Sequence, residues 1–343
     1  MELAVIASGM ITPLGFNAAA SLAALRAGIR VVEETNLWDP ESGRYLGAGK
    51  VALPHWWIGL GKLADLAAAA IHECFEAAHP VPPREIPVLL GVTAADRPDR
   101  VSGLDSEILV EIGHRLGFVL HPESRVIPRG QVSAAIGLQK AAELITGKRA
   151  GSVIVAAVDS LLRHGLKDHY LDRRRLLTPH NSNGFSLGEA ASAVLVTAAG
   201  ARPRGDGLRV LAVSLDREAA VIESDEPLLA EGLTRTIRKV LTDSGLAMQD
   251  LDQRMTDLNG EHYRFKEMAL AMGRFERKPG PRTFEILHPA EYIGDSGAAI
   301  GPILLAWALH AGVKGYACGP TTLCTLSNDN GERAAMIVRH PIN

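Results

Sequence analysis

Apolar and polar positions follow two periods along this chain, and these periods predict strands interleaved with helices. Nearly continuous apolar runs at 86–93 and 152–160 are typical of strands that are buried on both faces. Apolar side chains spaced three and four residues apart predict helices over 17–28 and 61–79. The first half of the chain is therefore expected to be an α/β unit.

The second half shows the same rhythm. Its expected strands are 208–216, 255–260, 315–319 and 333–340, and its expected helices are 226–245 and 262–273. A segment rich in Gly, Ala and Arg at 197–210 lies between the two halves, so we place domains at 1–200 and 201–343. Two such halves predict a duplicated α/β fold, in which layered sheets enclose the most apolar helices.

The two most apolar helices are expected at 131–147 and 296–313. The second segment contains no Asp, Glu, Lys or Arg, and its length is the minimum for a bilayer span. It also contains Pro302 and His310 and follows the acidic Asp295. We interpret it as a helix buried between two layers of a large soluble protein, because nothing else in the chain resembles a membrane segment.

The charge and the cysteine content of the chain argue against nucleic-acid binding and against a cysteine metal site. A formal net charge of −3 gives no basic field that would hold nucleic acid. The cationic run at 172–175 is short and is expected to be a solvated loop. The three cysteines lack metal-ligand spacing, so we expect reduced thiols, no metal, no cofactor and a cytoplasmic protein.

Three stretches carry a resemblance to a known family. These are "VIASGMITPLG" near the start, "GFSLGEAASAVLV" from Gly184 and "LCTLSNDNGERAAMIV" from Leu323. In this order they resemble the β-ketoacyl synthases, the condensing enzymes of the thiolase fold, and the resemblance spans nearly the whole chain. It implies a thiolase-like, duplicated five-layered α-β-α-β-α architecture and a place in fatty acid or polyketide biosynthesis.

The resemblance also implies where a nucleophile would lie. In that family a Cys begins the first buried helix. Matching "AAELI" at 141–145 to the family's helix body puts Gln131 at the Cys position, whereas anchoring on 135–137 would choose Arg129. A helix N-terminus lowers the pKa of a thiol, but a glutamine amide only donates and accepts hydrogen bonds. Chain-length factors and decarboxylating loading synthases resemble this chain in carrying Gln there, and the alternative is that Gln131 only fills space.

Both catalytic histidines of the family are replaced as well. The resemblance puts Asn259 at the first position and Gly294, or Asp295 after a one-residue deletion, at the second. The glycine loop of the family is replaced by the polar stretch 327–331, which argues against an apolar chain passing there. The residues expected around one pocket are Arg129, Gln131, Ser133, Asn259, Glu261, His262, Gly294, Asp295, Ser296, Cys324 and Asn328.

These replacements predict a non-condensing homologue, a pseudoenzyme that binds an acyl-type ligand, an acyl-carrier protein or a partner ketosynthase without forming an acyl-enzyme. The alternative is an enzyme of altered chemistry. It would be a malonyl-thioester decarboxylase that uses Gln131 and Asn259, or an acyl transferase or hydrolase that uses Ser133 and His262. The resemblance further implies a homodimer that is paired through the strand at 125–128.

Overall fold

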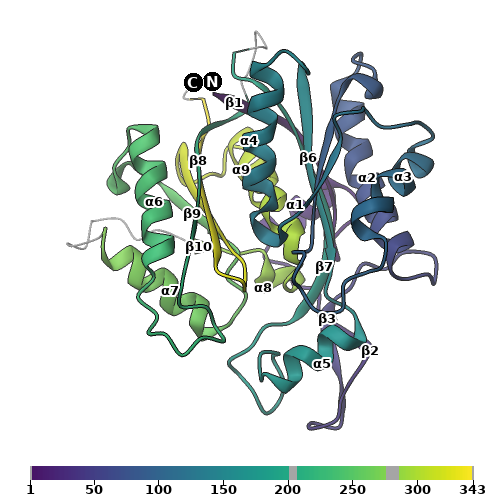
Figure 1. Ribbon diagram of the computed structural model, residues 1–343, viewed down its shortest axis with the longest axis vertical. Coiled ribbons are helices and arrows are strands. Elements are labelled where there is room, and N and C mark those ends of the chain that lie inside the picture. The colour runs from purple at the N-terminus through teal and green to yellow at the C-terminus, as the bar shows by residue number, and fades with distance from the viewer. Residues whose placement is uncertain (1, 201–206, 276–285, 342–343) are drawn as a thin grey trace.

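The computed structural model describes residues 2–200, 207–275 and 286–341, and strands alternate with helices along it (Figure 1). The strands are β1 (Leu3–Ile11), β2 (Glu33–Asp39), β3 (Arg44–Gly49), β4 (Val88–Val92), β5 (Arg125–Pro128), β6 (Ser152–Ser160), β7 (Leu187–Ala198), β8 (Leu208–Arg217), β9 (Gln253–Thr256), β10 (Ile286–Leu287), β11 (Thr321–Ser327) and β12 (Glu332–Arg339). The helices are α1 (Ala18–Arg26), α2 (Leu60–Ala78), α3 (Leu104–Leu116), α4 (Ser133–Thr146), α5 (His164–Asp172), α6 (Glu231–Ser244), α7 (His262–Gly273), α8 (Ala290–Ile293) and α9 (Ile300–Val313).

The two halves of the sheet have the same strand order. The path β5-β4-β6-β7-β1 in the first half matches β10-β9-β11-β12-β8 in the second. In each half the first three strands of this path are parallel to each other. The remaining two strands each pair antiparallel with the strand before them. β1 and β8 pair antiparallel over three residues, which joins the halves. The repeat confirms the predicted duplicated fold.

Five layers follow from this sheet (Figure 1). Helices α2 and α3 cover the outer face of the first half, and α6 and α7 cover the outer face of the second. Helices α4 and α9 lie between the two halves. A Cβ atom added to Gly301 of α9 would lie 2.5 Å from the Cβ of Ala134 in α4, so the two central helices approach each other closely.

The apolar segment after Asp295 is a buried helix. Ile300 to Leu309 of α9 are all buried, because side chains from both halves of the sheet surround the helix in one hydrophobic cluster. Among the described residues, no helix is long and apolar enough to cross a membrane. The interpretation of 296–313 as a core helix is therefore confirmed.

Some element predictions were wrong. The strand expected at 315–319 is a turn, because Gly315 has φ +69° and the strand begins only after Pro320. The helix expected from 226 begins at Glu231, because the preceding Ala230 adopts a left-handed conformation. The sequence patterns also missed the β2–β3 hairpin and α5. The predicted boundary at 200/201 adjoins 201–206, which lie outside the described residues, and stays a prediction.

Candidate functional site

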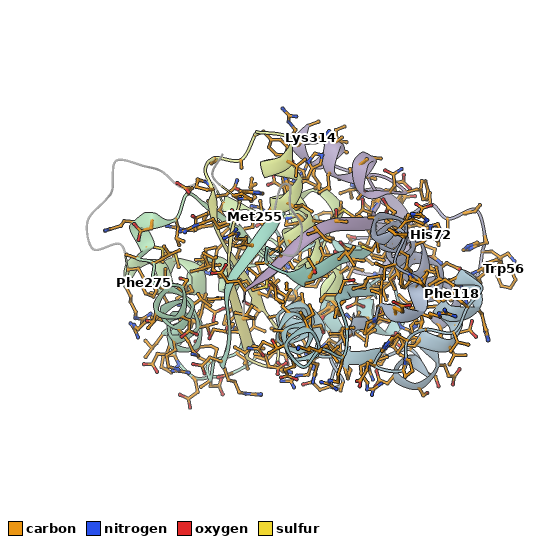
Figure 2. All side chains as sticks on the ribbon, turned by 90° about the horizontal axis from the view of Figure 1, so that it is seen from above. Trp56, His72, Phe118, Met255, Phe275 and Lys314 are labelled. Atoms are coloured by element: carbon orange, nitrogen blue, oxygen red, sulfur yellow. The ribbon has the colours of Figure 1, made fainter. Side chains whose placement is uncertain are left out.

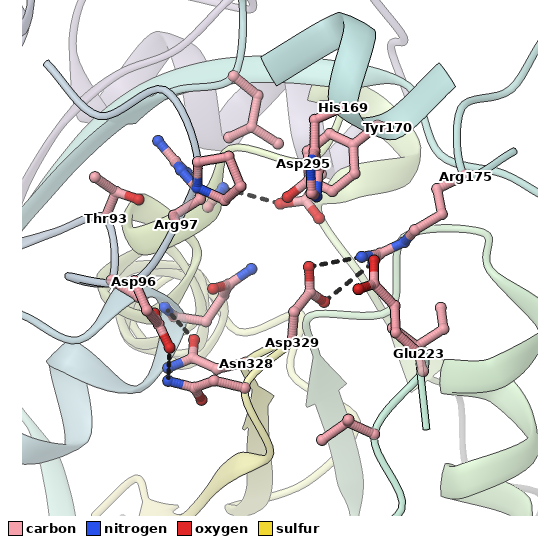
Figure 3. Close-up of a pocket in the computed structure, with 18 of the residues that line it drawn as sticks. Thr93, Asp96, Arg97, His169, Tyr170, Arg175, Glu223, Asp295, Asn328 and Asp329 are labelled. Carbon is pink, nitrogen blue, oxygen red and sulfur yellow. Dashed lines mark hydrogen bonds and ion pairs between the residues drawn. The ribbon is translucent and has the colours of Figure 1, made fainter. Parts of the chain in front are cut away.

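A cavity of about 330 Å³ opens where α4 and α9 begin (Figure 3). Each helix is preceded by one 3-10 turn, Gly130–Val132 and Gly297–Ala299. We call this the site cavity. Residues lining it include Thr93, Arg97, Gln131, His169, Tyr170, Arg175, Arg264, Asp295, Asn328 and Asp329.

Gln131 lines the site cavity, but its backbone donor is already bound. The Gln131 N–H donates to Asn328 Oδ1 at 2.9 Å, and Asn328 Nδ2 donates to the Arg129 carbonyl at 2.7 Å and to Glu332 Oε2 at 2.9 Å. The first N–H groups of a helix lack an intrahelical partner and commonly bind anions. Here the side chain of Asn328 takes that place. The Arg129 side chain is half exposed and forms an ion pair with Glu332.

The proposed nucleophile and base do not meet. Ser133 is buried beneath the first turn of α4, where its Oγ donates to the Ile127 carbonyl at 2.9 Å. His262 is exposed and lines a different cavity, together with Arg173 and Glu223. A Ser133–His262 pair is therefore not formed, and the expectation that both residues face one pocket was wrong.

Asn259 has no free donor. Its Nδ2 donates to Asp295 Oδ2 at 2.8 Å and to Glu261 Oε2 at 3.3 Å, which uses both amide hydrogens. Asp295 Oδ1 in turn accepts from the Gly297 N–H at 2.9 Å. Burial raises the pKa of Asp295, and Arg264 opposes this shift. The amide that a malonyl-thioester decarboxylase was expected to use instead fixes a carboxyl group at the start of α9.

Position 294 carries no side chain for a packing reason. Gly294 has φ +71°, and a Cβ there would lie 2.4 Å from the Leu187 carbonyl oxygen. Asp295, rather than Gly294, therefore presents its side chain to the cavity.

Arg129, Asn259 and Glu261 lie outside the cavity lining, and so do two further predicted pocket residues, Ser296 and Cys324. Ser296 is fully buried, and its Oγ has no hydrogen-bond partner among the described residues. Cys324 lies within β11, where burial raises its thiol pKa to about 12. A thiol with so high a pKa is a poor nucleophile. All of these residues were wrongly expected to line the pocket.

A network of arginines and carboxylates crosses the site cavity (Figure 3). Arg175 donates to Glu261 at 2.7 and 2.9 Å and to Asp329 at 2.8 and 3.0 Å. Arg264 also donates to Asp329, at 3.0 Å. Burial raises the pKa of Asp329, but Arg175 and Arg264 outweigh burial and hold that pKa below its ordinary value. The expected solvated loop at 172–175 was wrong for Arg175, whose side chain is only 6% exposed.

A second ion pair, between Arg97 and Asp159, lies on the side of the site cavity opposite Arg175 (Figure 3). Arg97 donates to both oxygens of Asp159 at 2.8 and 2.7 Å. Asp159 also accepts from the Ala298 N–H at 3.0 Å, which ties the pair to the start of α9. Such bidentate pairs fix both side chains in one geometry.

Two adjacent residues of α5 supply the remaining cavity chemistry. His169 lines the cavity, and burial followed by Arg173 lowers its pKa, so the imidazole is neutral near pH 7. Tyr170 also lines the cavity, and burial raises the pKa of its hydroxyl. The cavity lining contains no thiol, and the described residues contain no cluster that could hold a metal ion.

Sequence reasoning missed several lining residues because their partners are distant in the chain. Glu261 and Asp329 lie 86 and 154 residues from Arg175. A charged residue near the carboxyl end of an apolar strand, or in the loop that follows it, is one usable signal. Arg97 follows β4, and Asp159 lies near the end of β6.

No family model matches the sequence, and no curated protein matches it. Solved structures do match in fold. A structure of the acyl-carrier protein of a type II polyketide synthase with its ketosynthase, AntDE:AntF, matches with a TM-score of 0.81 at 16% identity, over 99% of both chains. The ishigamide ketosynthase/chain length factor matches with a TM-score of 0.71 at 18% identity, over 99% of both chains.

A third match is the ketosynthase ApeO in complex with its chain length factor ApeC from Xenorhabdus doucetiae. It has a TM-score of 0.76 at 14% identity, over 99% of this chain and 98% of that chain. Identities this low are evidence for the fold, and all three structures contain a ketosynthase. The chain therefore has the thiolase-like fold of the ketosynthases.

Proposed function

We propose that this chain is a non-condensing ketosynthase-like subunit, which binds a partner ketosynthase or a carrier protein without forming an acyl-enzyme. One observation carries the proposal. At the start of α4, where the family resemblance expects a nucleophile, the cavity presents Gln131, whose backbone N–H is bound by Asn328. Attack on a thioester needs both a nucleophile and free donors for the oxyanion.

The charged lining supports the same proposal. Arg175, Arg264 and Asp329 are fully engaged with each other and with neighbouring carboxylates. An apolar acyl chain in this space would lie against these charged groups and offer them no polar partner, which is unfavourable in a partly buried site. A role in polyketide or fatty acid biosynthesis in the cytoplasm would then come from pairing with a condensing enzyme.

The edge strand β5 is the proposed pairing surface. It lies at the end of the sheet, and among the described residues it pairs with β4 alone. Uncovered edge strands favour association with another strand. The partner is either a second copy of this chain or a condensing synthase.

An enzyme of altered chemistry has less support. Both amide hydrogens of Asn259 are occupied, and Ser133 donates to a backbone carbonyl away from His262. In the described cavity lining, His169, Tyr170 and the Gln131 side chain are the groups that favour it.

Intact mass spectrometry with an acyl thioester tests the absence of an acyl-enzyme. We expect no adduct on the wild-type protein and no release of CO2 from a malonyl thioester. An adduct on the wild type would reveal a nucleophile and would overturn the proposal. Decarboxylation that is lost in His169→Ala or Gln131→Ala would move the protein to the altered-enzyme class.

Light scattering tests the pairing. We expect a dimer mass at micromolar concentration, alone or with a co-expressed ketosynthase. Val126→Lys on β5 should give a monomer, because a lysine on an edge strand opposes strand pairing. Val313→Lys, at a position that is 70% exposed at the end of α9, should leave the mass unchanged. A monomer in both settings would contradict the pairing.

A further inference from the structure

A second cavity, of about 310 Å³, lies beside the Arg97–Asp159 ion pair. Its volume is at the lower end of the range found for ligand pockets. Thr93 and Arg97 line both cavities, Gln131 and Tyr170 line only the site cavity, and Ile58 lines only the second one. We call this second cavity the side chamber.

The side chamber opens where two parallel strands end. β4 ends at Val92 and β6 ends at Ser160, and the two strands pair in parallel. In open α/β sheets, ligands bind in the crevice beyond the carboxyl ends of the strands. The side chamber therefore occupies a position that suits a ligand.

One part of the chamber is aliphatic. Its apolar lining includes Leu63, Val101, Leu104 and Val158. At the rim, Ile58 is 80% exposed. The adjacent Trp56 is 89% exposed and projects from the edge of the molecule (Figure 2). Exposed apolar groups that adjoin an apolar cavity mark a binding surface. An aliphatic chain therefore fits between the apolar lining and Ile58 at the rim.

Another part contains two donor atoms that lack partners, beside the carboxylates of Asp99 and Asp159, which are paired with Arg163 and Arg97. Thr93 Oγ1 and Arg97 Nε are buried and have no hydrogen-bond partner among the described residues, and Thr93 is only 3% exposed. A buried donor without a partner is unfavourable, so a ligand acceptor that reached either atom would relieve this cost.

The start of α2 adds positive potential. Gly59 is the N-cap of this 19-residue helix, with no side-chain cap and no acidic residue in the first turn. Lys62 also lines the chamber, although its ammonium group already pairs with Glu189. Helix N-termini stabilise anions, which favours a carboxylate over a neutral head group.

We propose that the side chamber binds a linear aliphatic carboxylate of medium length. Its carboxylate accepts from Thr93 and Arg97, and its chain runs along Leu104 toward Ile58. This site goes beyond the proposed function, because it requires no partner chain, although its donors Thr93 and Arg97 also line the site cavity.

Calorimetric titration of the purified full-length chain with octanoate tests the proposal. We expect saturable one-to-one binding, at least about tenfold tighter than that of octan-1-ol, since charge-assisted hydrogen bonds are lost with the alcohol. Octanoyl-N-acetylcysteamine separates a free carboxylate from a thioester source. Tighter binding of the thioester, or no saturable heat up to millimolar octanoate, would overturn the proposal.

Matched variants locate the ligand. Thr93→Val removes one hydroxyl with little change of shape and should weaken octanoate binding about two- to tenfold. Ile58→Glu places a negative charge at the rim and should also weaken it. Val119→Glu, at a position 89% exposed elsewhere, and Tyr170→Phe in the site cavity should leave binding unchanged. Loss of binding in Tyr170→Phe, or an equal loss in Val119→Glu, would refute this location.

Discussion

At the start of α4, the side chain of Asn328 occupies the backbone donor that an oxyanion would need. The Gln131 N–H donates to Asn328 Oδ1 at 2.9 Å, so a nucleophile introduced at 131 would meet a blocked donor. The barrier to acyl transfer at this position therefore has two parts, the missing thiol and the occupied amide.

This arrangement predicts a dependence between two substitutions. Gln131→Cys alone should self-acylate slowly with an acyl thioester, and Gln131→Cys with Asn328→Ala should react at least about tenfold faster, because one oxyanion donor is worth roughly 10² to 10³ in rate. Rates of adduct formation by mass spectrometry would measure this. Gln131→Cys with Asn330→Ala, in the same loop, is the control. Equal rates in all three variants would show that Asn328 does not block the site.

The buried carboxyl group of Asp257 should make the stability of the protein depend on pH. Burial raises its pKa to about 6, and Arg264 opposes the shift, whereas the unfolded value is about 3.9. The folded state therefore holds the proton more tightly. The stability from this group is fully present below about pH 4 and is lost as the pH rises through about 6.

The Asp257→Asn variant isolates this contribution, because asparagine does not titrate. Between pH 4 and 6.5 the free energy of unfolding of the wild type should fall by about 2–3 kcal/mol relative to the variant. Urea unfolding at several pH values measures the difference. If the free energy of unfolding changed with pH in the same way in both proteins, the titrating group would not be Asp257.

At the scale of elements, the close approach of α4 and α9 depends on one missing methyl group. A Cβ on Gly301 would meet the Ala134 Cβ at 2.5 Å and the Leu326 Cδ1 at 3.3 Å. Both helices are part of one buried cluster, so neither can shift without disturbing the sheets that pack on it.

Gly301→Ala should therefore destabilise the protein by about 1–3 kcal/mol, as overpacking does, although alanine is the better helix former. Gly301→Ala combined with Ala134→Gly should recover part of this loss. Thermal unfolding of the two single variants and the double variant measures the coupling. A stabilised Gly301→Ala protein would mean that the helices separate easily.

Element patterns show what the sequence could reveal. The uninterrupted apolar character of α9 predicted its burial correctly, because only a core or a membrane accepts such a helix. The family register placed Gln131 at a helix start that lines the cavity. The role of Arg175 was not predictable, because its partners Glu261 and Asp329 come from distant loops that only the tertiary fold brings together.

At the scale of the whole molecule, the two halves share a core. One hydrophobic cluster contains Val5 and Leu138 from the first half together with Val210, Ile303 and Met336 from the second. The halves therefore repeat in topology without being separable in packing.

Residues 1–200 expressed alone should consequently fail to fold cooperatively, since the face of α4 and the edge of β1 would be exposed to water. Circular dichroism on heating should show no sharp transition for this fragment and a single transition for the full chain. Two separate transitions in the full chain would instead show that the halves fold independently.

Among the described residues, the main path of the sheet has two ends, and these ends are unequal. β5 has four residues, and the described part of β10 is Ile286–Leu287. A chain that adds to β5 leaves only a two-residue strand at the far end of the path, which offers few backbone groups to a third chain. β2, which lies off this path, carries Glu33 and Glu34. At rising protein concentration the chains should therefore associate into dimers, and these dimers should not assemble further into fibres.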